Sequence, residues 1–261
     1  MESRSPTPPV DRPRAPGRGT TVALIGQDGA GKSTIARAVS DALPFDAGLV
    51  YMGVNLDASS VMLPTTRLAL GLKRRGGRRA DMTAPGDDGT RPVSVLTGAR
   101  RLVRSVNWIA EEMYRSVLVR RIRRRGAVAI QDRDFYCDYY WSAVAPTSAK
   151  RRLDIRMHGA FLRRWYPKPD LVLLLDAPAE VLHRRRGDQT LESVAERRAR
   201  YLDLVPVLRT VQVVDADRPP GEVAADITQR IVAFVGTSVP SSRVNGTSPD
   251  VANSASAKVA P

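Results

Sequence analysis

The sequence predicts an α/β fold of three layers, in which an open five-stranded parallel sheet carries helices on both faces. Two observations lead to this prediction. Short apolar runs alternate with longer segments of helical periodicity, and the run Leu171–Leu175 is continuously apolar, as in a strand buried on both faces. A glycine-rich stretch, Gly26–Thr34, joins the first apolar run to the first helical segment. In such sheets, ligands bind beyond the carboxyl ends of the strands.

The first third of the chain contains two predicted strands and one well-defined helix. Thr21–Ile25 is an apolar run that we predict as the first strand, and Ser33–Leu43 repeats its apolar residues at helical spacing. A second strand is predicted at Gly48–Met52. The signal weakens after it, because Ser60–Arg75 could hold a helix and Gly76–Pro92 is a polar segment that we expect to be a flexible loop.

The middle of the chain is dominated by one long helix. Val93–Arg125 carries apolar residues at helical spacing over its length, and Gly126 is suited to ending it. Most of its arginines are expected to form a solvated face. Ala127–Gln131 is the third predicted strand, and Lys150–Tyr166 is a further helix that ends before two prolines.

The last third continues the alternation of helix and strand. After the fourth strand at Leu171–Leu175, a helix begins near Pro178, and Leu191–Leu208 forms a charged helix. Val211–Val214 is the fifth strand and Pro219–Val235 the final helix. The strands therefore follow one another through helices, as a parallel sheet requires.

Length and composition agree with one domain. The chain has 261 residues, of which 43% are hydrophobic and 26% charged, so residues 20–235 can build a substantial core. Residues 1–19 and 236–261 are rich in Pro, Ser and other small or polar residues and are expected to be a disordered arm and tail. The single Cys137 excludes an internal disulfide framework and is compatible with the cytoplasm. No apolar run is long enough to span a bilayer.

The formal net charge of +14 has two interpretations. Strongly basic proteins bind nucleic acids or anionic membranes, but a protein that handles two polyphosphates also needs positive charge. We expect the second interpretation to hold. The partner would then be a small phosphate acceptor rather than a membrane, and nucleic acid would not be the main partner.

The glycine-rich stretch has the spacing of a phosphate-binding loop. Gly26, four intervening residues, and then Gly31, Lys32 and Ser33 occupy every required position. Glycine lets the backbone N–H groups wrap closely around phosphates, and the following helix N-terminus favours anions. Lys32 can reach the β- and γ-phosphates of a bound nucleotide, and the Ser33 hydroxyl can bind Mg²⁺. The sequence therefore predicts nucleotide binding.

Two further groups of charged residues stand at strand ends. Asp132 and Arg133 follow the third strand, where the carboxylate can hold Mg²⁺ and the guanidinium can hold phosphate oxygens. Asp176 follows the fourth strand, but we expect it to be a cap or turn residue of the next helix. Residues 183–190, with three consecutive arginines before Gly187, are expected to form a mobile lid over the phosphates rather than an exposed helix end.

Aromatic residues gather after Arg133. We expect at least half of them to be core residues, although they could also stack on a nucleobase. They are Phe135, Tyr136, Tyr139, Tyr140 and Trp141.

Four stretches of the chain resemble the phosphate-loop (P-loop) nucleoside monophosphate kinases, and among these the thymidylate kinases. They are GQDGAGKST at Gly26–Thr34, Asp132-Arg133 after AVAIQ, LVLLLDAPAEVLHRRRGD at Leu171–Asp188, and RRARYLDL at Arg197–Leu204. The resemblance extends from about Thr20 to Val235. The segment VVDADRPPGEV near the end is similar to the last strand and adenine-side loop of that family.

The resemblance implies a P-loop kinase fold with an arginine-rich lid, transfer of the γ-phosphoryl group of ATP to a nucleoside monophosphate such as dTMP, and Mg²⁺ as the metal. It also implies a homodimer through the long helix. By position, Ser33 and Asp132 would bind the metal and Arg133 the acceptor phosphate. The ATP-binding residues would be Gly26, Gln27, Asp28, Gly29, Ala30, Gly31, Lys32, Ser33, Thr34 and Arg185. The catalytic residues would be Lys32, Asp132, Arg133, Arg184 and Arg186.

The acceptor side departs from the thymidylate kinase pattern. An Arg-Glu-Pro-Gly-Gly stretch usually follows the second strand, whereas Tyr51–Ser60 here is YMGVNLDASS. The long helix has Glu111 and Glu112, with Arg115 beyond, near the place of the arginine that meets thymine. Two alternatives therefore stay open: a kinase of a nucleoside, sugar or other small metabolite, and a nucleotide-dependent regulatory or nucleic-acid-binding protein.

Overall fold

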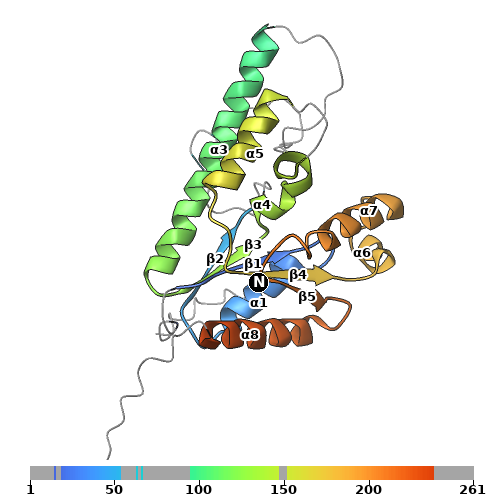
Figure 1. Cartoon of the computed structure of the whole chain (residues 1–261). Coiled ribbons are helices and arrows are strands. Elements are labelled where there is room, and N and C mark those ends of the chain that lie inside the picture. Colours follow the sequence, from blue (N-terminus) through green and yellow to red (C-terminus); the bar gives the residue numbers. More distant parts are fainter. Residues whose placement is uncertain are drawn as a thin grey trace, which may run out of the picture.

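The computed structural model of the chain describes residues 15, 19–53, 63, 66, 95–146 and 152–237. Along this part of the chain, strands and helices alternate as expected (Figure 1). The elements in chain order are β1 (Thr21–Ile25), α1 (Lys32–Ala42), β2 (Ala47–Tyr51), α3 (Val95–Arg124), β3 (Val128–Asp132), α4 (Phe135–Asp138), the π-helical turn η1 (Tyr140–Val144), α5 (Leu153–Arg164), β4 (Leu171–Asp176), α6 (Ala179–Arg186), α7 (Leu191–Leu202), β5 (Val211–Asp215) and α8 (Pro220–Thr237).

The strands form one parallel sheet in the order β2-β3-β1-β4-β5, which confirms the predicted fold class. β1 is central. It places Leu24 opposite Asp132 of β3 on one side and Ile25 opposite Leu174 of β4 on the other. The chain leaves β1 toward one side of the sheet and later returns to the other side, so a crevice forms beyond the end of β1. The glycine-rich loop begins at this point.

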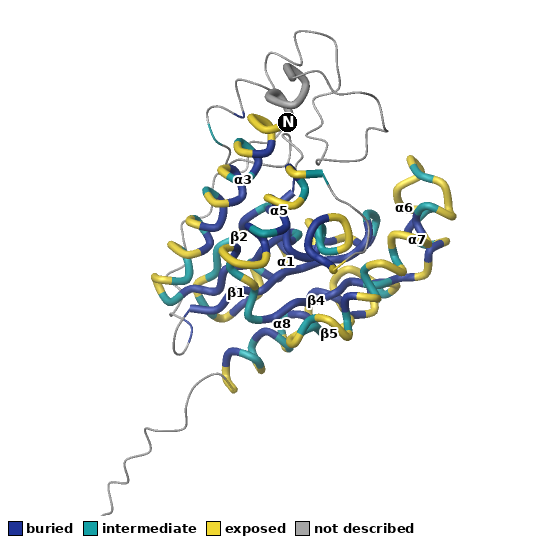
Figure 2. Tube along the Cα trace, turned by 45° about the horizontal axis from the view of Figure 1, so that its top comes forward, coloured by how far each residue is buried: buried dark blue, intermediate teal, exposed yellow. Residues whose placement is uncertain are grey.

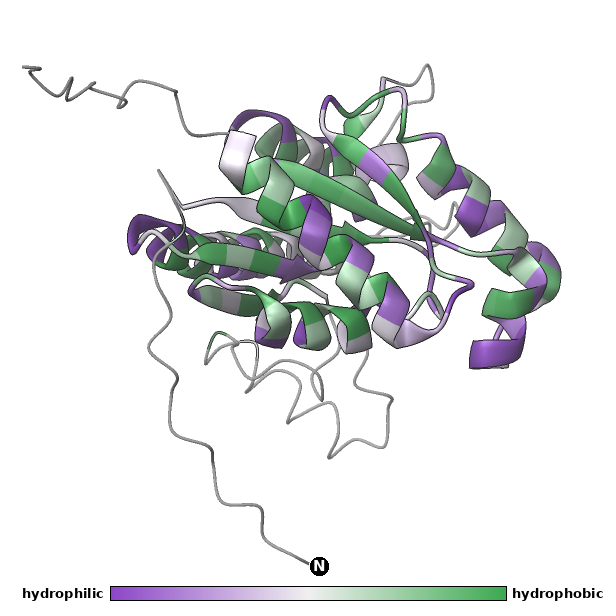
Figure 3. Ribbon diagram, turned by 90° about the horizontal axis from the view of Figure 1, so that it is seen from below, coloured by the Kyte–Doolittle hydropathy of each residue, from purple (hydrophilic) through white to green (hydrophobic). Residues whose placement is uncertain are grey.

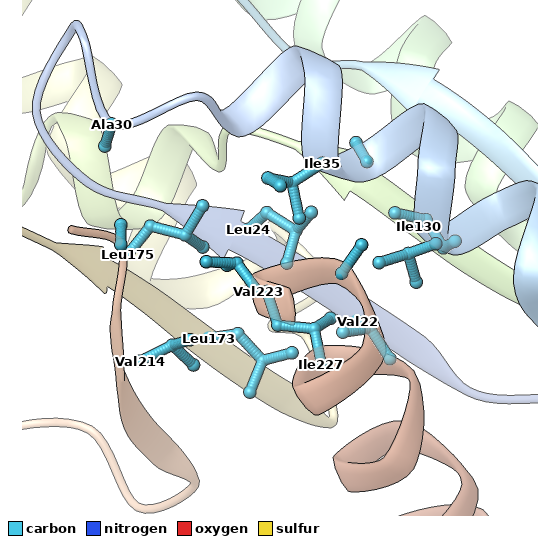
Figure 4. Packing of buried hydrophobic residues seen from close by; sticks show 14 of the residues in the cluster. Val22, Leu24, Ala30, Ile35, Ile130, Leu173, Leu175, Val214, Val223 and Ile227 are labelled. Atoms are coloured by element: carbon cyan, nitrogen blue, oxygen red, sulfur yellow. The ribbon is translucent and has the colours of Figure 1, made fainter. Parts of the chain in front are cut away.

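Helices α1 and α8 cover one face of the sheet. Alternate residues of each strand point to this face, where Leu24 and Leu173 pack against Ile35 of α1 and against Val223 and Ile227 of α8 (Figure 4). All five side chains are buried. This core holds the start of α1, and with it the end of the glycine-rich loop, against the sheet.

Helices α3, α4 and α5 cover the opposite face (Figure 1). There, Val50 and Ala129 of the sheet contact a cluster that includes Trp108 of α3, Phe135 of α4 and Phe161 of α5. Figure 3 shows the strands as a hydrophobic layer, with polar residues on the helices around it. The three predicted layers are therefore present.

The outer side of α3 is exposed along much of its length (Figure 2). Its exposed apolar residues are Leu102, Val103, Val106, Met113 and Val117. Among the helices that the structure describes, none is long and apolar enough to cross a membrane.

Most element boundaries agree with the sequence prediction. Each strand begins and ends within one residue of its expected position. The helix predicted to extend to Leu208 is shorter, because α7 ends at Leu202 and turns follow it. Pro206 explains the difference, since proline lacks an N–H donor and disfavours helical geometry in the residue before it.

Two residues of the arm predicted to be disordered are packed. Ala15 is buried in the core beneath α1 and α8, and its N–H donates to the carbonyl of Gly126 over 3.0 Å. The carbonyl of Gly19 accepts from Arg123 over 2.7 Å. These two residues of the arm therefore contact the folded domain. The rest of that arm, the tail from 238 onward, the helix at 60–75 apart from residues 63 and 66, and the loop at 76–92 lie outside the described residues.

Candidate functional site

The glycine-rich loop between β1 and α1 takes a conformation that requires glycine. Gly26, Gly29 and Gly31 all have positive φ, at 139°, 95° and 83°. A Cβ atom at Gly29 would lie 2.7 Å from the carbonyl oxygen of Leu182, and one at Gly26 would collide with the carbonyl oxygen of Leu175. The loop is thus pressed against β4 and α6. No side chain caps the N-terminus of α1, so its first N–H groups are available to a ligand.

Lys32 lies folded over this loop. Its side chain is buried, and Nζ donates to the carbonyl oxygens of Gly26 at 2.8 Å and Gln27 at 3.0 Å. Burial, together with the charge of Arg133, lowers the pKa of Lys32 to about 8. An anion in the loop would oppose both effects, because it would offer the ammonium group a charged partner.

Asp28 lies among three cationic side chains beside the loop. Its carboxylate forms an ion pair with Arg133 and lies 3.5 Å from Lys32 Nζ and 3.9 Å from Arg186. Burial raises the pKa of Asp28, but Arg133 and Lys32 outweigh that effect and hold it below its usual value. The three cations therefore converge on one carboxylate beside the loop.

Asp132 ends β3 beside the start of the loop, as predicted. It is buried, and among the described residues its Oδ1 has no hydrogen-bond partner. Ser33 is exposed in the first turn of α1. No group of three or more potential metal-binding His, Cys, Asp or Glu side chains exists in the described part of the chain. Mg²⁺ retains several waters and needs only one or two protein ligands, so an unpartnered carboxylate oxygen such as that of Asp132 suits it.

Arg133 follows Asp132 with a strained backbone. Its φ is 78°, which is uncommon for a residue other than glycine and is typical of functional sites. Burial disfavours the charged guanidinium, but Asp138 and Asp28 outweigh it and raise the pKa of Arg133. The guanidinium is therefore held, fully charged, beside the loop.

The arginines at the end of α6 do not all lie near the loop. Arg185 donates to the carbonyl of Ala216 over 2.9 Å, and Arg186 pairs with Asp188 over 3.1 Å while remaining near Asp28. Arg184 is exposed to solvent. The lid segment is also joined to the loop by a 3.1 Å hydrogen bond from Gln27 to Gln189.

Two pockets flank the loop on opposite sides. The first, of about 370 Å³, lies between the loop and the region after β5. It is lined by Gly29, Ala30, Gly31, Thr34, Ile35, Arg185, Ala216, Arg218, Pro220 and Val223. The second, of about 550 Å³, is lined by Arg133, which the sequence analysis assigned to an acceptor phosphate, and for that reason we call it the acceptor pocket. It is lined by Gln27, Asp28, Met52, Gly53, Arg133, Phe135, Cys137, Asp138, Tyr139, Trp141, Ser142, Arg197, Arg200, Tyr201 and Leu204. The phosphate loop separates them, so two ligands could meet there.

Comparison with known proteins gives a structural match. No protein-family model matches the chain, and no curated protein sequence matches it. The structure is similar to a solved structure of thymidylate kinase from Candida albicans, with a TM-score of 0.55 and 16% sequence identity, over 83% of this chain and 92% of that one. The fold is that of a P-loop nucleoside monophosphate kinase.

Within this kinase fold, sequence reasoning missed most of the acceptor pocket. Arg197, Arg200, Tyr201 and Leu204 have the spacing of one helical face, and all line it. The RRARYLDL stretch contained this signal, but periodicity alone could not tell a pocket wall from a core face. Asp138 was also missed.

The aromatic group divides as expected. Phe135 and Tyr136 are buried in the core, and Tyr139 and Tyr140 are partly buried against it, whereas Trp141 is 40% exposed on the pocket wall. Phe135 and Tyr139 also line the acceptor pocket. Core packing and pocket lining are therefore not alternatives for these residues.

Two other polar residues have roles that the sequence did not predict. Asp176 does not cap α6, whose N-cap residue is Pro178; its carboxylate instead accepts two 2.7 Å hydrogen bonds from Arg198 of α7. Arg115 is buried within α3, where Glu111 and the backbone carbonyls of Tyr51 and Gly53 bind its guanidinium. Its hydrogen-bonding capacity is largely used within the protein.

Proposed function

We propose that the protein transfers the γ-phosphoryl group of ATP–Mg²⁺ to a nucleoside monophosphate, in the manner of a thymidylate kinase. The observation that supports this most directly is the position of the phosphate loop between two pockets, with Arg133 in the wall of the acceptor pocket and Asp132 next to the end of β1, opposite Leu24. The pocket beside Arg185 and Arg218 would take the base and sugar of ATP. The acceptor pocket would take the second substrate.

Positioning and charge neutralisation supply the rate in this mechanism. The loop N–H groups and Lys32 hold the β- and γ-phosphates, and Arg133 holds the acceptor phosphate in line with them. An acceptor oxygen bonds to the γ-phosphorus as the bond from phosphorus to the bridging oxygen breaks, and ADP leaves with that electron pair. Mg²⁺ held by Ser33 and Asp132 would neutralise charge on the phosphate oxygens. Arg184, Arg185 and Arg186 of the lid would close over them and exclude water.

A kinase of another small acceptor is the second candidate, and Arg115 favours it. In the described residues, the guanidinium of Arg115 is bound by Glu111 and backbone carbonyls rather than directed into the acceptor pocket. Recognition of thymine through this arginine would require that network to open. The Candida albicans enzyme is itself described as having broad substrate specificity.

The test is ADP formation from ATP–Mg²⁺ across a panel of nucleoside monophosphates, nucleosides and sugars, measured against the rate without acceptor. Stimulation by dTMP alone supports the first candidate, and stimulation by another compound supports the second. ATP binding without any stimulated transfer would contradict both and favour a regulatory protein.

Two variants test the assigned roles. We expect Lys32→Ala to lower kcat by about 100-fold or more and Asp132→Asn to impair Mg²⁺-dependent transfer without unfolding the protein. Lys168→Ala and Asp170→Asn are matched controls, because Lys168 is exposed against Tyr136 and Asp170 lies at the opposite end of the strands. Near-normal activity of either test variant would contradict the mechanism.

We also propose that the partner is a second copy of the chain, bound through α3. Val103, Val106, Met113 and Val117, with Ala110 between them, are spaced alternately by three and four residues, which is the spacing of paired helices. Val106→Glu should convert a dimer to a monomer in sedimentation velocity, whereas Val207→Glu, at a comparably exposed valine, should not. A wild-type chain that stays monomeric at high micromolar concentration would exclude this interface.

A further inference from the structure

A carboxylate that the proposed mechanism does not use lies in the wall of the acceptor pocket. Asp138 is the last residue of α4, and it is partly accessible from the pocket. Tyr201 of α7, which also lines the pocket, donates its hydroxyl to Asp138 Oδ1 over 2.8 Å. The carboxylate is therefore held in one orientation by a residue 63 positions away in the chain.

The wall that carries Asp138 is held together at several points. Trp141, which lines the same pocket, donates its indole N–H to the backbone carbonyl of Arg200 over 2.8 Å. Together with the hydrogen bond between Tyr201 and Asp138, this contact fixes α7 against the segment that follows β3. A ligand in the pocket would therefore meet preorganised groups rather than mobile ones.

The charges around Asp138 limit what it can bind. Burial raises the pKa of Asp138 and outweighs Arg133 and Lys32, which favour the charged form, while Asp28 adds to the effect of burial. Arg133 already forms an ion pair with Asp28. An anionic ligand group placed against Asp138 would meet like charge, so the ligand atom that fits there is a hydrogen-bond donor.

The position of Asp138 beside Arg133 indicates which donor this is. This step rests on the proposed function, in which Arg133 holds the acceptor phosphate. The sugar of a nucleoside monophosphate is attached directly to that phosphate, so the sugar, and not the base, enters the space next to Arg133. Tyr139 and Trp141 provide aromatic surface in the same wall, against which the sugar ring can pack.

We propose that Asp138 is a specificity-determining residue that accepts a hydrogen bond from a sugar hydroxyl of the acceptor. The acceptor is accordingly a hydroxyl-bearing sugar phosphate, and Tyr201 is a positioning residue that orients the carboxylate. A partly buried carboxylate that is oriented to bind a hydroxyl discriminates against an analogue that lacks it, because the carboxylate oxygen that Tyr201 does not bind then loses its partner.

The experiment compares acceptors that differ by a single hydroxyl. Ribonucleoside monophosphates and their 2′-deoxy and 3′-deoxy forms are titrated into the wild-type chain, and binding is followed by tryptophan fluorescence, to which Trp141 contributes from the pocket wall. ADP formation is measured in parallel. For the wild type, we expect removal of one of the two hydroxyls to weaken binding and lower kcat/KM by about 10-fold or more. In Asp138→Ala, which removes both acceptor oxygens, removal of the same hydroxyl should change the affinity and kcat/KM by less than about 3-fold.

Two further variants separate this role from a structural one. Tyr201→Phe keeps the ring but frees Asp138, and it should reduce the discrimination without abolishing it. Glu196→Gln changes a carboxylate of α7 that pairs with Arg200 and does not line the pocket, so its discrimination should equal that of the wild type. All variants are compared by thermal unfolding so that a folding defect is recognised.

The outcomes distinguish this inference from the proposed function. Equal binding of all three forms by the wild type, no binding of any of them, or undiminished discrimination in Asp138→Ala would overturn the inference. ATP binding is measured separately, in the absence of acceptor. Its loss would contradict the proposed kinase activity, whereas hydroxyl discrimination in the fluorescence titration would still support the role of Asp138.

Discussion

Helix α7, which forms one wall of the acceptor pocket, is joined to the end of β4 by a bidentate ion pair. Nε and Nη2 of Arg198 each donate to Asp176 at the end of β4, at 2.7 Å. Asp176 is 17% exposed and Arg198 34% exposed, so solvent reaches the pair only in part. We predict that Asp176→Asn and Arg198→Lys both destabilise the protein and weaken acceptor binding.

The expected magnitude follows from this geometry. Hydrogen bonds to charged groups contribute about 1.5–3 kcal/mol when sheltered, whereas exposed ion pairs contribute about 0.2–1 kcal/mol. A bidentate pair at intermediate exposure should therefore have a coupling energy of about 1–2 kcal/mol. For a domain of this size, each kcal/mol corresponds to about 2–4 °C in Tm. Arg198→Lys should lose part of this energy, because an ammonium group cannot reproduce both hydrogen bonds.

The assay is a double-mutant cycle. Unfolding free energies of the wild type, both single variants and the double variant are measured in urea, and the acceptor KM is measured for each. Asp226→Asn and Arg230→Lys are matched controls, since this pair also joins Arg Nε to a carboxylate, at 2.6 Å, but lies within α8. The controls should lower stability without changing the acceptor KM. A coupling energy near zero for Asp176 and Arg198, or an unchanged acceptor KM, would refute the reasoning.

Three further predictions concern the loop and β3. Arg133→Ala should raise the acceptor KM by about 10-fold or more while changing the ATP KM by less than about 3-fold, as steady-state kinetics would measure. Gly26→Ala should abolish nucleotide binding and destabilise the protein by about 2 kcal/mol or more in urea unfolding, because its positive φ and the carbonyl of Leu175 leave no room for a Cβ. Burial raises the pKa of Asp134 to about 6, so the wild type should lose stability on the order of 2 kcal/mol as the pH rises from about 4 to 6.5. Asp134→Asn should not show this loss.

The sign of the pH prediction follows from the raised pKa. Native Asp134 retains its proton to a higher pH than the unfolded chain does, so its contribution to stability is full at about pH 4 and is lost as the pH rises through 6. Asparagine does not titrate in this range. Parallel curves of stability against pH for the wild type and Asp134→Asn would contradict the prediction.

For Arg133, equal effects on both KM values would contradict its assignment to the acceptor side. Unaltered nucleotide affinity in Gly26→Ala would contradict the role given to the loop conformation at Gly26.

The sequence by itself determined the sheet and the position of the glycine-rich loop that follows β1. Five apolar runs gave the strands within one residue, and the confirmed parallel order follows from the helices between them. The loop at Gly26–Thr34 could be predicted because its chemistry depends on residues that are neighbours in the chain. Asp132 could be predicted because it directly ends a strand that lies next to β1.

Only the tertiary structure decided the acceptor side. The hydrogen bond between Asp138 and Tyr201 spans 63 positions, and the ion pair between Asp176 and Arg198 spans 22. Neither has a local pattern, because a helical face of arginine, tyrosine and leucine has the same periodicity whether it meets solvent, core or a ligand. Arg115 shows the same limit, since only packing placed it against Glu111 and two backbone carbonyls. The loop can be predicted from the spacing of neighbouring residues, whereas the pocket forms only when folding packs particular helix faces against one another and against the sheet.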